Sequence, residues 1–384
     1  MRYVVYAVPL LWTLTAHAAA LPPALEAPAQ RTLALIYNME FDAALTSAQT
    51  VVALAPASPA GYYYRAAAYW QWRLVARDPQ QRATLLMALH DAVRRTLEVA
   101  ERLPADRAAE AAFYLGAAYG TQARLYVVEK QYFKALGAAK KGGAYLQRCV
   151  ELDPTWHDAY LGLGVYHYYL ARVPGFVRGL AQWLIGLEGA RDRGLQELEI
   201  AHSKGVLAAP EAMSILAKIY ASAGEQQYDK ARSLLESLAQ QYPGNIDYRY
   251  RLLLLYAQLG HWPQAQQTGQ HLLADIAQGK LPYAQPWVPL LHYRTAEAYV
   301  LQGEAEAALP ILQTLQTAPL DDMLRPWVIL RLGNVYDLRG DHPTARTYYK
   351  RVTGSDDATE LASQYDTTRF TPGPIALKPP EKII

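Results

Sequence analysis

Apolar and polar positions follow a helical spacing along most of the chain. From Arg31 onward, apolar residues recur three and four positions apart, and no convincing two-residue alternation of a β-strand is present. Residues at these spacings lie on one face of an α-helix. The pattern therefore predicts an all-α protein built from amphipathic helices.

The helical pattern repeats along the chain. The landmarks Leu332-Gly333, Tyr336, Gly340 and Ala345 have counterparts at similar spacings upstream. Four of the tyrosines, at intervals of 36, 43 and 37 residues, are Tyr220, Tyr256, Tyr299 and Tyr336. A period of this size is typical of two-helix units that stack on one another, because a single unit leaves an apolar face exposed to water.

The landmark residues fit the physics of a helix pair. Gly333 and Ala345 provide room where two helices approach closely. We expect Gly340 to end the first helix in a left-handed conformation, Asp341 to cap the second helix, and Pro343 to lie in its first turn, where no N–H is needed.

This pattern of Leu-Gly, Tyr, Gly and Ala resembles the tetratricopeptide (TPR) repeat. The likeness is clearest from Pro210 to Val352 and looser upstream, as at Leu115-Gly116 with Pro154. The resemblance implies a right-handed α-solenoid of about seven helix pairs with a concave groove. It also implies an irregular array over 21–209, a regular array over 210–353, and a short helix with a Pro-rich tail over 354–384.

A second resemblance covers residues 168–205, "YYLARVPGFVRGLAQWLIGLEGARDRGLQELEIAHSKG". This stretch is similar to a Pro-bearing insertion, here 171–193, in a group of bacterial TPR proteins. The matching positions are Gly189, Asp192-Arg193, Gly194-Leu195, Leu198, Ala201 and Gly205. The apolar side of a helix over 174–187 either contacts a membrane surface or a hydrophobic ligand, or packs on the solenoid.

The first twenty residues, "MRYVVYAVPLLWTLTAHAAA", have the composition of a secretory signal. A charged start at Arg2 precedes an apolar stretch, and small residues suited to cleavage follow. We predict export, most simply to a bacterial periplasm, with an uncleaved signal as a weak anchor or an ordinary N-terminal helix as the alternatives. Since no Cys lies near the cleavage site, lipoprotein-type attachment is not predicted.

Charge and motif content restrict the classes of chemistry. The formal net charge is +2, without a long basic run, so nucleic acid is not an expected partner. The single Cys149 occupies a slot for a small buried residue, and His157 and His167 lack a zinc-binding spacing. We predict no catalytic residue, no metal and no cofactor.

An arginine precedes the first landmark in each of the last three repeats: Arg251, Arg294 and Arg331. We considered a guanidinium ladder that binds an acidic peptide or a carboxylate in the groove, together with Tyr250, Tyr293 and Asn334. TPR proteins that clamp peptide carboxylates have an Arg at this position in one repeat, accompanied by a set of Lys and Asn residues. In this chain, only Asn334 matches a member of that set. In the alternative interpretation, the ladder is neutralised internally by Asp247, Glu297 and Asp337.

Aromatic residues are concentrated near one helix, at Tyr62, Tyr63, Tyr64 and Trp70, in a chain with 29 Tyr and 8 Trp. Most such rings fill gaps between TPR helices. Three consecutive tyrosines cannot all face one core, however, so one or two are expected to line the groove as anchors for a ligand.

The functional prediction is an exported scaffold or adaptor that binds another protein or peptide in its concave groove. The first alternative is an accessory component of envelope transport that binds a small or lipidic ligand, which a large and dry internal pocket would favour. The second is a secreted helical-toroid enzyme, which two close carboxylates in a cleft would favour.

Overall fold

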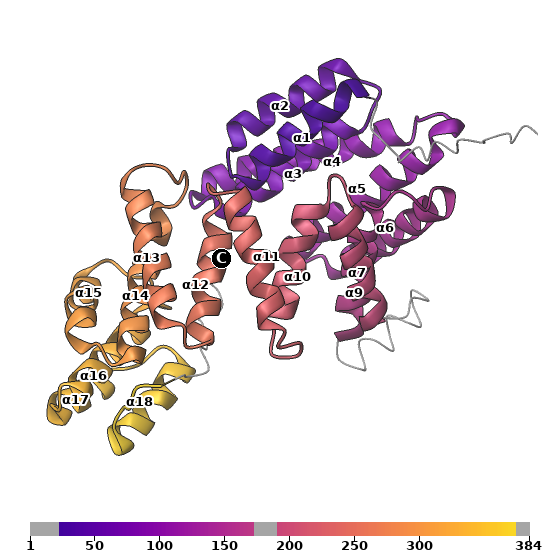
Figure 1. Cartoon of the computed structure of the whole chain (residues 1–384). Coiled ribbons are helices and arrows are strands. Elements are labelled where there is room, and N and C mark those ends of the chain that lie inside the picture. Colours follow the sequence, from indigo (N-terminus) through magenta and orange to yellow (C-terminus); the bar gives the residue numbers. More distant parts are fainter. Residues whose placement is uncertain (1–22, 173–189, 374–384) are drawn as a thin grey trace, which may run out of the picture.

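The computed structural model describes residues 23–172 and 190–373, and all regular secondary structure in these ranges is helical (Figure 1). This confirms the predicted all-α solenoid of TPR-like repeats. Eight consecutive helix pairs are described. They are α1 (Pro23–Tyr37) with α2 (Phe41–Leu54), α3 (Ala60–Val75) with α4 (Pro79–Ala100), α5 (Ala108–Val128) with α6 (Tyr132–Leu152), α7 (Ala159–Arg172) with α9 (Arg191–Lys204), α10 (Ala209–Tyr220) with α11 (Tyr228–Gln241), α12 (Ile246–Gln258) with α13 (Trp262–Ala277), α14 (Val288–Gln302) with α15 (Ala305–Thr317), and α16 (Arg325–Leu338) with α17 (His342–Tyr349).

A further helix, α18 (Asp356–Thr368), packs on the last pair, and two short 3-10 helices lie at Ala105–Arg107 and Gln285–Trp287. The proposed signal at 1–20 and the predicted 174–187 helix lie outside the described residues, as does the tail from 374 onward.

Local sequence signals set the helix ends. Gly340 has φ +81°, and the Asp341 side chain accepts a hydrogen bond from the Thr344 backbone N–H at 3.1 Å. Pro343 lies in the first turn of α17. Asp78 caps α4 in the same way, with Pro79 at the first helical position. These are the stop and start signals predicted for a tight turn between paired helices.

Small residues allow the paired helices to approach closely. A Cβ atom added at Gly333 would overlap the ring of Tyr349, and Ala345 is fully buried. The same principle operates between α7 and α9, where Gly164 and Gly194 face each other's backbone. Leu198 and Ala201, which belong to the same motif, are fully buried. The described part of this motif, residues 192–205, therefore has a packing role, whereas Gly189 lies outside the described residues.

Replacing Ala345 by Leu is expected to lower the free energy of unfolding by roughly 1–3 kcal/mol, because extra methylenes must fit between α16 and α17. Gly333→Leu should have an effect of similar size. Urea denaturation followed by circular dichroism measures both changes. Variants that unfold at the wild-type midpoint would show that the packing at this repeat is different.

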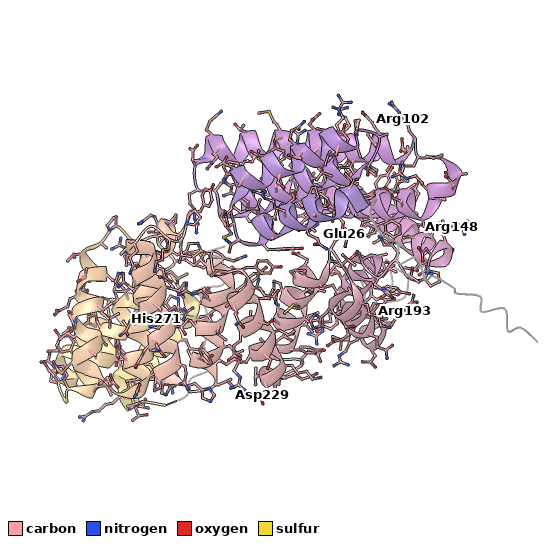
Figure 2. The ribbon with its side chains drawn as sticks, turned by 45° about the horizontal axis from the view of Figure 1, so that its top comes forward. Glu26, Arg102, Arg148, Arg193, Asp229 and His271 are labelled. Carbon is pink, nitrogen blue, oxygen red and sulfur yellow. The ribbon has the colours of Figure 1, made fainter. Side chains whose placement is uncertain are left out.

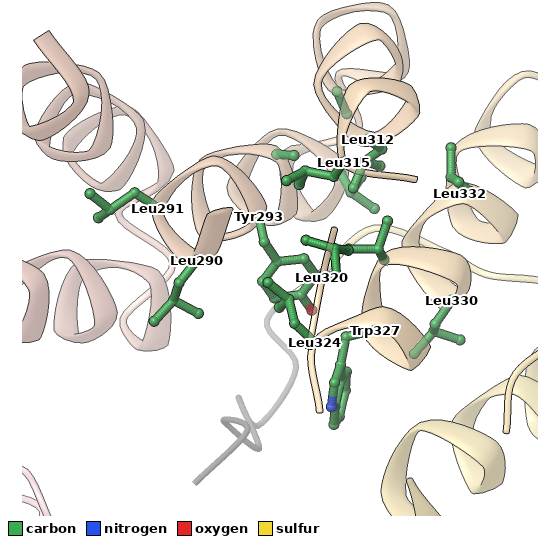
Figure 3. Packing of buried hydrophobic residues seen from close by; sticks show 14 of the residues in the cluster. Leu290, Leu291, Tyr293, Leu312, Leu315, Leu320, Leu324, Trp327, Leu330 and Leu332 are labelled. Carbon is green, nitrogen blue, oxygen red and sulfur yellow. The ribbon is translucent and has the colours of Figure 1, made fainter. Parts of the chain in front are cut away.

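The largest hydrophobic cluster occupies the C-terminal repeats. Figure 3 shows Leu290, Tyr293, Leu312 and Trp327 interleaved between α14, α15 and α16. Charged side chains such as Arg102, Arg148 and Asp229 lie on the periphery (Figure 2). Within 23–172 and 190–373, no helix is both long enough and apolar enough to cross a membrane.

The solenoid curls until its first repeat contacts a repeat far along the chain. Asn38 Oδ1 accepts a hydrogen bond from the Gly244 N–H at 2.8 Å, and Asn245 Nδ2 donates to the Tyr37 carbonyl at 2.7 Å. Phe41 packs on Tyr283 with ring centroids 5.4 Å apart. The α1–α2 turn thus meets the α11–α12 turn, so helices α1–α4 lie across the rest of the array (Figure 1).

Candidate functional site

The predicted arginine ladder is located mostly inside the protein. Arg294 is 2% exposed and Arg331 is 1% exposed. Both pair with Glu297: Arg294 Nη1 lies 2.5 Å from Oε2, and Arg331 Nη2 lies 2.7 Å from Oε1. The groove-surface interpretation is therefore wrong for these two residues. Glu297 lies one turn from Arg294 on α14, and the packing of α16 on α14 brings Arg331 to the same carboxylate.

The companions of the ladder are buried as well. Asn334 accepts from Arg331 Nη1 at 2.9 Å and donates to the Tyr349 hydroxyl at 3.1 Å. The Tyr293 hydroxyl donates to Glu297 at 2.7 Å. Tyr250 packs edge-on against Trp287. Asn334, Tyr293 and Tyr250 are core residues and not groove residues, since each lies within the interface between stacked repeats.

Electrostatics keeps the buried carboxylate charged. Burial alone would raise the pKa of Glu297, but the two guanidinium groups and the Tyr293 hydroxyl lower it to about 2. Burial pushes the pKa of Arg294 and Arg331 down, yet their charged neighbours hold it above the usual value. The three side chains form one permanently charged Arg–Glu–Arg triad, in line with the internal neutralisation considered above.

Arg251 has a different environment. Its side chain is partly exposed, and its Nε donates to Asp247 Oδ2 at 2.7 Å. Its remaining donors reach the carbonyl and the hydroxyl of Ser214, both at 3.1 Å. Arg251 therefore ties α12 to α10 and neutralises Asp247.

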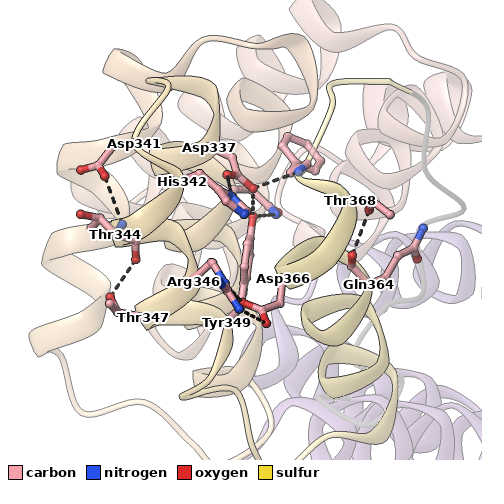
Figure 4. A network of polar contacts seen from close by, with 12 residues as sticks. Asp337, Asp341, His342, Thr344, Arg346, Thr347, Tyr349, Gln364, Asp366 and Thr368 are labelled. Carbon is pink, nitrogen blue, oxygen red and sulfur yellow. Dashed lines mark hydrogen bonds and ion pairs between the residues drawn. The ribbon is translucent and has the colours of Figure 1, made fainter.

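Asp337 does not neutralise the ladder, contrary to the alternative interpretation. Its carboxylate accepts from the Tyr349 hydroxyl at 2.6 Å and from the Phe370 N–H at 2.9 Å, and His342 Nδ1 lies 2.6 Å away (Figure 4). Arg346 pairs with Asp366 at 2.7 Å in the same region. This network joins α16, α17 and α18 and is structural.

A cavity of about 320 Å³ lies inside the curl of the first five helix pairs. Its walls come from α1, α3, α5, α6, α7 and α10 together with the α9–α10 loop. The wall is largely apolar and rich in rings, which are Tyr37, Tyr63, Tyr64, Trp70, Phe113 and Tyr166. The closure of α1 over the later repeats thus converts part of the concave groove into a pocket of the size that binds small molecules or single side chains.

Three of the four aromatic candidates line this cavity. Tyr63, Tyr64 and Trp70 belong to its wall, whereas Tyr62 reaches back to the Pro56 carbonyl at 3.5 Å. Tyr63 packs edge-on against Phe113 with centroids 6.4 Å apart. The consecutive tyrosines therefore diverge around α3, as the helical geometry requires.

Glycines create the space. A Cβ atom added at Gly120 or Gly143 would meet no heavy atom within 4 Å, and both residues line the cavity. Gly116 and Gly142 have the opposite role, because a Cβ there would press on Leu146 or on the α5 backbone. The glycines inside α5 and α6 are the sequence feature related to this cavity, but they do not by themselves locate it, since Gly137 of α6 is equally unobstructed and lies outside the lining.

One arginine and two acidic residues line the cavity. The Arg124 guanidinium stacks over the Trp70 ring, 5.0 Å from its centroid, and is solvent-exposed. Asp158 accepts from the Leu207 and Ala208 N–H groups at 2.9 and 2.8 Å. Glu211 lies in the first turn of α10. Arg124, Asp158 and Glu211 were not among the predicted site residues, because they come from α5, the α6–α7 turn and α10, which share no motif.

The remaining candidates for chemistry are structural. Cys149 is fully buried, and burial raises the pKa of its thiol to about 12, so the thiol stays protonated and unreactive. His167 is buried beside Glu197, with 2.5 Å between Nδ1 and Oε2. Among the residues that the structure describes, no group of three or more His, Cys, Asp or Glu side chains is arranged to hold a metal ion.

Comparison with known families agrees with this architecture. Residues 222–285, which contain α11, α12 and α13, match the family model of the tetratricopeptide repeat. No curated protein matches the chain. The match places tetratricopeptide repeats at 222–285, and the stacked helix pairs on both sides support a solenoid of TPR-like repeats. Tetratricopeptide repeats typically bind other proteins or peptides, which points to a scaffold for protein–protein interaction.

Proposed function

We propose that the protein is an exported scaffold that holds a segment of a partner protein in the closed part of its concave groove. The observation that supports this proposal is the aromatic cavity of about 320 Å³ inside the first five pairs. A cavity of this volume takes one or two side chains and excludes a whole helix. The partner would therefore anchor an extended segment through a buried side chain.

The proposed binding site lies in the N-terminal half, away from the arginine positions predicted from the sequence. The C-terminal repeats have their arginines occupied by Glu297 and Asp247, so they offer no free guanidinium ladder to an acidic partner. The N-terminal half offers aromatic rings and open space instead. Tyrosine and tryptophan anchor partners well, because they bury a large area with few rotatable bonds.

Export is part of the proposal and rests on the first twenty residues, whose charged start, apolar stretch and small residues suit a signal peptide. An envelope partner would follow. The largely apolar cavity also supports a second candidate function, the binding of a small ligand in envelope transport, because such a ligand requires an apolar pocket of this size.

The test compares two glycine variants of the full chain. Gly143→Leu places a side chain in the cavity, whereas Gly137→Leu adds the same side chain to α6 outside it, where a Cβ also meets nothing within 4 Å. Partners are recovered from the envelope by cross-linking and affinity purification, then quantified by mass spectrometry. We expect Gly137→Leu to recover the wild-type partner and Gly143→Leu to recover at least about tenfold less, because the anchor site is filled.

Equal recovery by all three proteins, with Gly143→Leu still folded, would show that the partner does not use the cavity. Recovery of intact Met1 in the cytoplasm would contradict export.

A further inference from the structure

The cavity combines aromatic faces with carboxylates that other side chains leave without a salt bridge. Within the described ranges, no ion pair is formed by Glu211 or by Asp158, whose oxygen accepts from backbone N–H groups. The one cationic lining residue, Arg124, is exposed and lies over Trp70. Asp158 and Glu211 thus contribute two carboxyl groups to a largely apolar wall, of which burial raises the pKa of Asp158, while the Glu211 charge also acts on Arg251.

The tyrosines of the wall respond to these charges. Burial is the main cause that raises the pKa of Tyr37 and Tyr63, and the Glu211 charge raises both further. Asp158 acts in the same direction on Tyr63 and on Tyr64, whereas Arg124 opposes the shift at Tyr63. The tyrosines of the wall therefore remain neutral, and Glu211 also acts on the Arg251 guanidinium, whose pKa it raises.

The cavity wall also contains a tyrosine hydroxyl without a hydrogen-bond partner among the described residues. The Tyr166 hydroxyl is buried and makes no hydrogen bond to the described residues, whereas the buried Tyr64 hydroxyl lies near that of Tyr114. Phenolic oxygens accept from an N–H donor, and ring faces attract cations. A buried polar group without a partner costs free energy that a bound donor would recover.

We propose that the cavity binds an ammonium group carried on an apolar chain, with Glu211 as the charge partner and the rings of Tyr37, Tyr63 and Tyr166 around the chain. A lysine side chain of a partner and a free alkyl amine share this chemistry. The inference rests on the proposed use of the cavity as the binding site and specifies what enters it.

The first experiment uses three six-carbon probes that differ in the terminal group: hexylamine, hexanol and hexanoate. Each is titrated into the full chain at pH 7 and followed by calorimetry. We expect hexylamine to bind about tenfold more tightly than hexanol, and hexanoate more weakly than both, since a charge-assisted hydrogen bond in a dry site is worth at least this factor.

The second experiment removes the charge partner. Glu211→Gln keeps the shape and should reduce the preference for hexylamine over hexanol about tenfold, while the affinity for hexanol stays within about twofold. Glu360→Gln is the matched control, because this exposed carboxylate lies on α18, away from the cavity. A preference unchanged in Glu211→Gln, or hexanol or hexanoate binding as tightly as hexylamine, overturns the proposal.

Peptides separate the two sources of the ammonium group. An alanine-based peptide with one lysine is compared with the same peptide carrying norleucine, which lacks the charge. Tighter binding of the lysine peptide than of hexylamine assigns the site to a partner side chain, and the reverse order assigns it to a free amine.

The outcomes also separate this inference from the proposed function. If no probe binds but Gly143→Leu still loses the partner, the cavity holds the partner and the ammonium proposal fails. If hexylamine binds with the expected preference and Gly143→Leu keeps the partner, the partner-binding function fails and the ammonium site stands.

Discussion

Glu297→Ala is expected to lower the free energy of unfolding by about 3–5 kcal/mol, because it leaves Arg294 and Arg331 as buried charges without a counter-ion. Each guanidinium group is buried away from water in the folded state, and the Glu297 carboxylate is the counter-ion that compensates its charge. Urea denaturation followed by circular dichroism measures the change. The matched control is Glu306→Ala on α15, whose side chain is 76% exposed and pairs with Arg339 at 3.0 Å. Its effect should stay below about 1 kcal/mol.

The pH dependence of the triad has a defined sign. The pKa of Glu297 is lowered in the folded state to about 2, so its stabilising contribution is complete above the unfolded value near 4.5 and disappears as the pH falls toward 2. The stability difference between wild type and Glu297→Gln should therefore be largest at neutral pH and shrink below about pH 4. A loss smaller than about 1 kcal/mol at pH 7 would contradict a buried triad.

Gly194→Ala is expected to cost about 3 kcal/mol, the upper end of the range for overpacking. A Cβ at this position would lie 2.5 Å from the Tyr168 backbone nitrogen and 2.9 Å from the Gly164 carbonyl oxygen. Backbone atoms cannot rotate aside as a side chain can, so α7 and α9 must separate along their whole interface. Thermal unfolding measures the change.

Gly137→Ala on α6 provides the contrast. A Cβ there meets nothing within 4 Å, so alanine should stabilise the protein by about 0.5–1 kcal/mol through its better helix propensity. Should Gly194→Ala melt at or above the wild-type temperature, the close crossing of α7 and α9 would be wrong.

The repeat landmarks show which structural features could be predicted from the sequence. Gly340, Asp341 and Pro343 act as predicted, because a turn and a cap involve residues only a few positions apart. The notch at Gly333 is likewise filled by Tyr349 of the next helix. Spacing therefore predicted the helices and their pairing, and the landmark residues carried the resemblance to the TPR repeat.

The candidate site was predicted less well, and the arginines explain why. Arg251, Arg294 and Arg331 occupy equivalent positions in their repeats. Arg251 is partly exposed and pairs with Asp247, whereas Arg294 and Arg331 are buried and both pair with Glu297. A repeat alignment assigns all three to equivalent positions, and the sequence indicated Asp247 and Glu297 as counter-ions on the same helices as Arg251 and Arg294. It could not show that Arg331 on α16 shares Glu297 of α14, because that contact depends on how the two helices pack.

The sequence by itself determined the features that arise within one or two repeats: the helical spacing, the tight turns and the small residues at helix crossings. Only the tertiary structure decided that the array curls until Tyr37 meets Asn245, a contact across 208 positions of the chain. The small rotation between neighbouring pairs accumulates over many repeats. A local sequence pattern does not show this accumulated rotation. The rotation nevertheless narrows the groove and brings Tyr37, Trp70 and Glu211 around one cavity.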